Sequence, residues 1–299
     1  MSQKEFYDAL IDCGNNELAM LLSMNHSKLK TPLMLPLASN VRTLYSQGKT
    51  GTCWLSSALL CISLYLKKIK GIEMTEETAF SKSYLLFHDK IERTEWYLSL
   101  IESNIDDEQR MRYILNHLMT DQGQWNMARN LILKYGLIPY SAMPDPFHQK
   151  SLIDLNVSIS NMLKFYALHL KKKPSASEKD SMKSIIMNTV KRMLVHLLGE
   201  PPTEISAPDI FQCKNKISPQ SFFYDYIDFP FDDYLFICNF APEKNTFYEV
   251  TLDNNMMDGM PEILLNLLED DFHIAMYNQL ARDGFCWYTC DASKGFCLE

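Results

Sequence analysis

The sequence predicts a protein in which helices and strands are segregated along the chain, as in an α+β fold. Apolar residues recur at helical spacing through most of the first 200 of the 299 residues. The pattern changes after Pro201-Pro202, where residues 234–238 and 247–251 are short runs rich in aromatic and β-branched side chains. A chain of this length can bury a sizeable core in one large or two ordinary domains.

Helices account for most of the first two thirds of the chain. The expected helices span residues 1–30, 53–70, 81–120, 125–135, 152–172 and 178–198, and 31–45 is expected to be an extended arm. Gly71 and Gly136 stand where C-terminal caps belong, and Pro139 follows the second of them. The acidic run at 106–108 favours a helix start, because negative charge is stabilised at a helix N-terminus.

The helices at 152–172 and 178–198 are expected to form a hairpin inserted into the core. The linker between them, residues 173–178, is rich in Pro and Ser. Their apolar stripes are predicted to contain Leu155, Met162, Phe165 and Leu168 in the first helix, and Ile186, Val190, Met193 and Leu197 in the second.

The last hundred residues combine strands with two further helices. Beyond the strands at 234–238 and 247–251, Pro261 is expected to start a helix that runs to about Glu269. Residues 272–282 predict another helix, capped by Gly284, and 285–289 predict a buried strand.

Composition excludes several classes of partner. The net charge of −8 and the pI of about 5.4 argue against a nucleic-acid surface. The polar N-terminus shows no signal sequence, and the apolar run from Leu59 to Leu66 is too short to span a membrane. Eight irregularly spaced cysteines do not form a secreted disulfide pattern, so we expect a reducing, cytoplasmic location without membrane contact.

A candidate nucleophile lies at the start of the helix at 53–70. Gln47 precedes Cys53 by six residues, Gly51 lies between them, and Trp54 follows. Backbone N–H groups and the positive end of the helix dipole favour the thiolate form of such a cysteine. The Gln47 side chain and the Cys53 amide can both donate to an oxyanion. A lone cysteine in a helix is most often a buried structural residue, but the residues around this one favour a catalytic role.

This motif resembles that of the papain-like cysteine peptidases, and more closely the bleomycin hydrolase and aminopeptidase C branch. There the motif reads Gln-x-x-x-Gly-x-Cys-Trp. Further landmarks of the branch match in the same order, at residues 80–92, 123–127, 134–139, 198–202, 218–223 and 281–291. Within them Asn126 replaces an Asp of the branch, which is expected to preserve a hydrogen bond but not the charge.

The resemblance implies an α+β papain-like fold with a helical insertion and an incomplete β-rich half. The expected parts are residues 1–150, with the N-terminal arm and the helical half, 151–217, the insertion, and 218–299, the start of the β-rich half. The implied function is a cysteine-type aminopeptidase that cleaves short peptides through the Cys53 thiolate, with Gln47 as the second catalytic residue. It implies no metal or organic cofactor, a cytoplasmic location and a homo-hexamer.

The catalytic base of the branch has no match in this sequence. The branch carries its His and Asn in His-Ala-Met and Asn-Ser-Trp-Gly contexts, after the segment that matches 281–291. His273 comes before that segment, in a predicted helical stripe, and we expect the other six histidines to be surface or structural residues. The 299 residues alone are therefore expected to have little peptidase activity. The alternative hypothesis is an inactive relative that acts as a binding or assembly partner.

A zinc site is not expected. Cys286, Cys290 and Cys297 are the only closely grouped cysteines, but they form no Cys-x-x-Cys pair and have no histidine near them.

Overall fold

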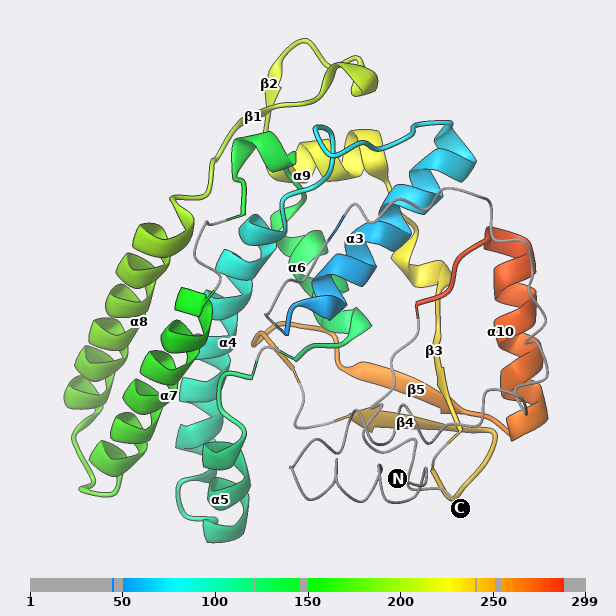
Figure 1. Ribbon diagram of the computed structural model, residues 1–299. Coiled ribbons are helices and arrows are strands. Elements are labelled where there is room, and N and C mark those ends of the chain that lie inside the picture. The colour runs from blue at the N-terminus through cyan, green and yellow to red at the C-terminus, as the bar shows by residue number, and fades with distance from the viewer. Residues whose placement is uncertain are drawn as a thin grey trace, which may run out of the picture. The chain divides into compact units, whose positions relative to one another are not determined.

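The computed structural model describes residues 45, 51–120, 122–145, 150–239, 241–250 and 254–287. The chain divides into two units, 1–41 and 42–299, and every described residue lies in the second. The predicted helix at 1–30 lies outside the described residues, as does the predicted arm except for Tyr45. The architecture of the described part is α+β, as the sequence predicts, with a series of helices followed by a small sheet and a last helix (Figure 1).

Helix α3 packs against α4 and α6, and α4 in turn contacts α5, α7 and α8. The bounds of α3 follow the sequence prediction. The helix spans Cys53–Tyr65 and continues as one π-helical stretch, Leu66–Lys70. It ends at Gly71, whose φ of 66° is left-handed and suits glycine. Both predicted ends are therefore confirmed. The helix is apolar on nearly all sides because α4 and α6 both pack against it.

Three helices follow, and each begins or ends at a residue whose chemistry explains the boundary. They are α4 (Lys82–Asn104), α5 (Glu108–Asn116) and α6 (Trp125–Tyr135). Ser81 caps α4 by accepting a hydrogen bond from the Tyr84 amide at 3.1 Å. Asp107 caps α5 in the same way, as the acidic run at 106–108 predicts. Gly136, with φ 77°, ends α6.

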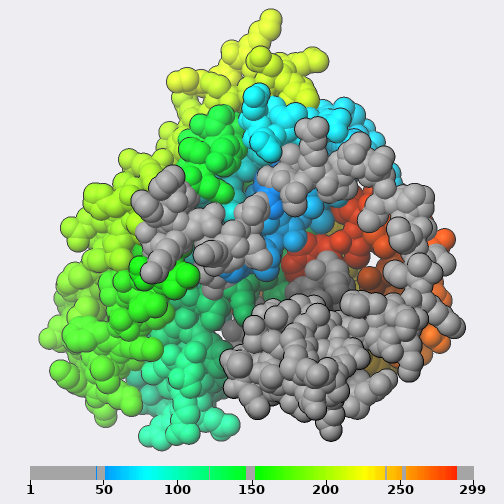
Figure 2. All heavy atoms as spheres, viewed as in Figure 1, coloured from blue at the N-terminus to red at the C-terminus, as the bar shows by residue number. Residues whose placement is uncertain are grey.

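Helices α7 (Lys150–Leu170) and α8 (Ala176–Leu198) form the predicted hairpin. They pack on each other and on α4, and form one side of the described part (Figures 1 and 2). A capping box formed by Ser175 and Glu178 starts α8.

The buried stripe of α7 differs from the prediction. Phe165 and Leu168 are 60% and 62% exposed, so their assignment to the core was wrong. The face that α7 buries contains Leu155, Ile159, Leu163, Tyr166 and Leu170. On α8, Ile186 and Val190 are buried as predicted, whereas Met193 and Leu197 are only partly buried, beside the fully buried Leu194 and Leu198. Both helices carry apolar residues on more than one face, so helical spacing does not determine which face meets α4.

The main sheet has three strands, β3 (Phe236–Cys238), β4 (Thr246–Val250) and β5 (Glu262–Asn266). Their order is β3-β5-β4, with β3 parallel and β4 antiparallel to β5. The prediction of a helix from Pro261 to Glu269 was therefore wrong, because this segment is the central strand. Its side chains alternate in the way of a strand, with Glu262, Leu264 and Asn266 buried. Both edges of its backbone are hydrogen-bonded, to β3 and to β4. This pairing favours the strand conformation over the helical one, which the apolar sequence also permits.

Smaller elements join these parts. The strands β1 (Ile205–Ser206) and β2 (Lys216–Ile217) pair antiparallel, and α9 (Pro219–Ser221) leads into a π-helical stretch at Phe222–Ile227. Short 3-10 turns occupy Tyr140–Ala142, Asp209–Phe211 and Phe231–Asp233.

Helix α10 (Glu269–Asp283) closes the described part and ends at Gly284, with φ 78°, as predicted. It begins three residues before the expected start. The strand predicted at 285–289 is not formed at 285–287, and residues 288–289 lie outside the described residues.

Candidate active site

Cys53 occupies the first position of α3 and is exposed. Of the other cysteines that the structure describes, Cys61 and Cys238 are buried, and Cys213 and Cys286 are half-buried. Burial raises the pKa of the Cys61 thiol to about 12, with a smaller contribution from Cys286, and burial also raises the pKa of Cys286. Among the described cysteines, Cys53 is therefore the one that is both open to solvent and placed at a helix N-terminus.

The backbone before Cys53 starts the helix without a side-chain cap. Thr52 has φ −90° and ψ 22°, and its carbonyl accepts the first helical hydrogen bond, from the Ser56 amide at 3.1 Å. The Thr52 side chain makes no capping hydrogen bond. It therefore does not compete with a ligand for the amide groups of the first turn, where the helix dipole is positive.

Trp54 holds the start of α3 against the start of α6. Its side chain is only 2% exposed, and it lies directly on Gly123. A Cβ atom on Gly123 would be 2.5 Å from the indole atoms Cδ2 and Cε2, which is far inside van der Waals contact. This contact explains why Gly123, just before α6, accompanies the nucleophile motif: the backbone there must carry no side chain for Trp54 to pack. The sequence singled out both segments but not their contact.

Three buried polar atoms near these helix starts have no hydrogen-bond partner among the described residues. They are Oγ of Ser56, one turn after Cys53, Oε1 of Gln124, at the N-cap position of α6, and Oδ1 of Asn126, in the first turn of α6.

The landmark segments 80–92 and 134–139 meet in a polar network that joins α4 to α6. The Tyr135 hydroxyl donates to Glu92, and Lys134 Nζ lies 2.6 Å from Glu92 Oε1. The Tyr84 hydroxyl donates to the Tyr135 carbonyl at 2.8 Å. Burial, followed by the hydrogen bond to Glu92, raises the pKa of Tyr135. These landmarks therefore position the two helices that support α3.

His88 is part of the same network and is neutral at pH 7. Its ring stacks on Tyr135 with 3.7 Å between centroids. Burial, with a smaller contribution from the charge of Lys134, lowers the pKa of His88 to about 4. Its Nε2 atom is buried without a hydrogen-bond partner in the described part of the chain. His88 is therefore a structural residue, as expected, but the hydrogen-bonding capacity of Nε2 is not satisfied there.

A buried ionic cluster lies in the same two turns of α4. Arg93 contacts Asp89 at 3.0 Å, and Lys90 Nζ lies 3.7 Å from the same carboxylate. Asn255 donates to Asp89 Oδ1 at 3.1 Å and to the Met127 carbonyl at 3.3 Å. Burial opposes ionisation of Asp89, but Arg93 and Lys90 outweigh it and hold the pKa of that carboxyl below its ordinary value. Sequence analysis missed Asn255, because it lies 166 positions from Asp89 and nothing in the local pattern connects the two.

Asn126 and Asn130 fasten the loop at 254–260 to α6. Their Nδ2 atoms donate to the Met260 carbonyl at 2.9 and 3.0 Å, and the Met260 amide donates back to Asn130 at 3.2 Å. Asn126 therefore makes a hydrogen bond, but through Nδ2, which an Asp lacks. Its Oδ1 atom, the counterpart of a carboxylate oxygen, is buried without a partner among the described residues, so preservation of the Asp hydrogen bond stays a prediction.

No hydrogen bond joins Cys53 to any of the histidines that the structure describes, which are His88, His117, His169, His196 and His273. His273 lies on α10 and is 66% exposed, its Nε2 atom is 3.9 Å from Glu269, and its ring contacts that of Phe272. Its expected place within an apolar stripe was wrong. His26, His148 and Gln47 lie outside the described residues, so the pairing of Gln47 with Cys53 stays a prediction.

The described residues offer neither a metal site nor a membrane span. Within the described ranges no three His, Cys, Asp or Glu side chains are grouped in a way that could hold a metal ion, and Cys290 and Cys297 lie outside those ranges. None of the described helices has the length and apolar character needed to cross a membrane.

Comparison with known proteins supports the resemblance read from the motifs. The model of the Peptidase C1-like family matches residues 15–297. Aminopeptidase C of Listeria monocytogenes is 29% identical over 267 residues, which cover 83% of this chain and 58% of that protein. Bleomycin hydrolase of Homo sapiens is 26% identical over 272 residues, 84% of this chain and 59% of that protein. The chain therefore spans less than two thirds of the length of these relatives.

The fold has a counterpart among solved structures. A crystal structure of PepW from Lactobacillus rhamnosis superposes with a TM-score of 0.74 at 25% sequence identity. The match covers 95% of this chain and 69% of that one. The papain-like α+β fold and the likeness to the bleomycin hydrolase and aminopeptidase C branch are thereby confirmed.

Proposed function

Because the chain belongs to the Peptidase C1-like family, we propose that it is a cysteine-type peptidase of the bleomycin hydrolase type with Cys53 as its nucleophile. The observation that carries this proposal is the exposed Cys53 thiol at the first position of α3, inside a family motif. The names of the relatives, aminopeptidases and a hydrolase, favour an enzyme over the alternative of a binding or assembly partner.

The chemistry assigns a role to each element of the motif. The Cys53 thiolate attacks a peptide carbonyl carbon, and the oxygen becomes an oxyanion that the Gln47 side chain and the Cys53 amide stabilise. The peptide C–N bond then breaks and a thioester remains on Cys53; in the branch the leaving amine takes its proton from the imidazolium of the catalytic His, which has no match in these 299 residues. Water then hydrolyses the thioester, which releases the acyl part as a carboxylic acid and regenerates the Cys53 thiol.

Substrate class, location and assembly belong to the same proposal. Short peptides trimmed from the N-terminus are the substrates that the relatives named aminopeptidase C suggest. The net charge of −8 fits a protein without a nucleic-acid partner. A cytoplasmic location and a homo-hexamer follow from the resemblance, as does the division into a helical half (1–150), an insertion (151–217) and a β-rich part (218–299).

The proposal is tested with an electrophile that needs only the nucleophile and its substrate site. The protein is treated with leucine chloromethyl ketone and, in parallel, with its N-acetylated form, and modified peptides are mapped by mass spectrometry. The Cys53 sulfur should displace chloride and form a thioether, faster with the reagent that has a free ammonium group. Cys53→Ser should abolish this labelling and Cys213→Ser should not. Labelling spread over other cysteines, or equal rates for the two reagents, would contradict a thiol aminopeptidase.

A further inference from the structure

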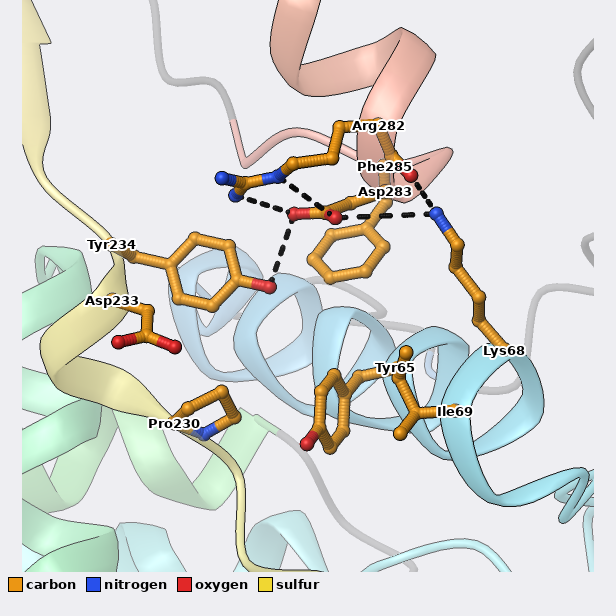
Figure 3. A pocket seen from close by; sticks show the side chains of 9 residues that line it. All are labelled: Tyr65, Lys68, Ile69, Pro230, Asp233, Tyr234, Arg282, Asp283 and Phe285. Carbon is orange, nitrogen blue, oxygen red and sulfur yellow. Dashed lines mark hydrogen bonds and ion pairs between the residues drawn. The ribbon is translucent and has the colours of Figure 1, made fainter.

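A pocket of about 490 Å³ lies at the opposite end of α3 from Cys53 (Figure 3). Tyr65 from the end of α3, Tyr234 from the segment before β3, and Arg282 from the end of α10 line it. Tyr65 is twelve residues after Cys53, so at about 1.5 Å of rise per residue the two are roughly 18 Å apart along the helix. The pocket is therefore separate from the candidate nucleophile.

One end of this pocket is lined by two cationic side chains. Arg282 and Lys68 share a single carboxylate, that of Asp283, at 2.8 and 4.0 Å (Figure 3). The Tyr234 hydroxyl donates to the same carboxylate at 3.3 Å, and Lys68 also donates to the Arg282 carbonyl. Arg282 and Lys68 approach this carboxylate from opposite sides (Figure 3), and Arg282 also lies in the field of Asp233. Lys68, at 4.0 Å, is the less closely paired of the two cations, so it is the one that can accept a ligand carboxylate.

The other end has a negative charge and aromatic walls. Asp233 lines the pocket and forms no ion pair with any residue that the structure describes. Burial, followed by the charges of Asp228 and Asp233, raises the pKa of Tyr65. The rings of Tyr65, Tyr234 and Phe285 line the same space. Carboxylates and aromatic faces both attract an ammonium group.

A second, apolar cavity of about 430 Å³ adjoins the first. The residues that line both are Asp233, Tyr234, Arg282 and Phe285. The rest of the second cavity includes Phe236 of β3, Met276 of α10 and the partly buried Trp287. Nε1 of Trp287 is buried and has no hydrogen-bond partner among the described residues, so it is a donor available to a ligand oxygen.

We propose that the two adjoining cavities bind a small hydrophobic zwitterion, a free apolar amino acid or a dipeptide, at a site distinct from Cys53. The ligand carboxylate lies at Lys68, its ammonium group at Asp233, and its apolar side chain among the aromatic residues of the second cavity. A zwitterion fits both charged ends at once, whereas an anion or a cation alone leaves one end unmatched. This site does not depend on the proposed catalytic activity.

The ligand chemistry is tested by calorimetric titration of the 299-residue protein after alkylation of Cys53, which blocks the candidate active site. The probes are leucyl-leucine, N-acetyl-leucyl-leucine, leucyl-leucine amide, glycylglycine and free leucine. Leucyl-leucine should bind, and loss of either charge should weaken binding roughly fivefold, the effect of a solvent-screened pair. Glycylglycine should bind at least tenfold more weakly because it fills no apolar cavity. The affinity for free leucine is compared with that for leucyl-leucine: the probe that binds more tightly shows whether the site takes an amino acid or a dipeptide.

Variants locate the binding. Lys68→Met and Asp233→Asn should each weaken leucyl-leucine binding about fivefold. Their matched controls, Lys67→Met and Asp232→Asn, remove the same charges from adjacent residues outside both cavities and should have no effect. Asp233→Asn should not weaken binding of the N-acetyl analogue, because that probe has no ammonium group to lose its partner. No binding of leucyl-leucine, equal binding of the uncharged analogues, or equal effects of the control variants would overturn the proposal.

Discussion

Replacing Gly123 by alanine tests whether the contact with Trp54 holds the nucleophile helix in place. The new Cβ atom would lie 2.5 Å from two indole atoms of Trp54, about 1 Å inside the ordinary contact distance. Neither side can yield easily, because Trp54 is 2% exposed and Gly123 directly precedes α6. Overpacking of this kind costs about 1–3 kcal/mol, so we expect Gly123→Ala to lower the free energy of unfolding by about 2 kcal/mol.

A double-mutant cycle shows whether the cost comes from this contact. Trp54→Leu alone should cost about 2–4 kcal/mol by leaving a cavity. In the double variant the alanine methyl group occupies part of that cavity. The double variant should therefore lose less unfolding free energy than the two single variants together, by at least about 1 kcal/mol. Urea denaturation with an unchanged m-value measures each free energy. Gly199→Ala is the control, because its Cβ would meet nothing within 4 Å and only its φ of 90° is strained. It should be additive with Trp54→Leu. A neutral Gly123→Ala, or an additive cycle, would refute the reasoning.

Three further variants test the site and its support. Gln47→Ala, in a form that turns over, should lower kcat roughly 100-fold with little change in KM, as loss of an oxyanion donor does; a pure KM effect would remove it from that role. His88 has a pKa of about 4 in the fold and about 6.5 when unfolded, so the unfolded state binds its proton first as the pH falls. Between pH 7 and 5 the unmodified protein should therefore lose about 1–2 kcal/mol more unfolding free energy than the variant His88→Phe. Phenylalanine keeps the stack on Tyr135 but does not titrate. Parallel pH profiles of the two proteins would contradict this. Asn255→Ala should cost about 2–3 kcal/mol in urea, because Asp89 loses a buried donor, and a loss below about 1 kcal/mol would show that water replaces the amide.

Helix boundaries were the part of the fold that the sequence predicted best. Gly71, Gly136 and Gly284 all end helices with positive φ, where they were expected. These ends are local: a glycine relieves the strain of a left-handed residue whatever the rest of the chain does. For the same reason Asp107 could be recognised as the start of α5 from its neighbours alone.

Features that depend on distant segments could not be read in the same way. The run Ile263-Leu264-Leu265 is compatible with a helix or a buried strand, and the hydrogen bonds to β3 and β4 decide between them. Phe165 and Leu168 have helical spacing, but α4 packs against another face of α7. In both cases the partner element, which is absent from the local pattern, determines the outcome.

The candidate site shows the same division. The place of Cys53 at the first position of α3 follows from a local motif and is what the structure has. The contact of Trp54 with Gly123 and the hydrogen bond of Asn255 to Asp89 join residues far apart in the chain. Spacing alone contains no information on such pairs.

The central claim is that Cys53 is the reactive nucleophile of this chain, and brief alkylation tests it most directly. The native protein is treated with a small excess of iodoacetamide at pH 7, quenched at increasing times, and digested, and the modified fraction of each of the eight cysteines is measured by mass spectrometry. Cys53 should be modified first, because it is exposed at a helix N-terminus, whereas burial raises the pKa of Cys61 to about 12. Earlier modification of Cys61 or Cys238 than of Cys53 would contradict the assignment.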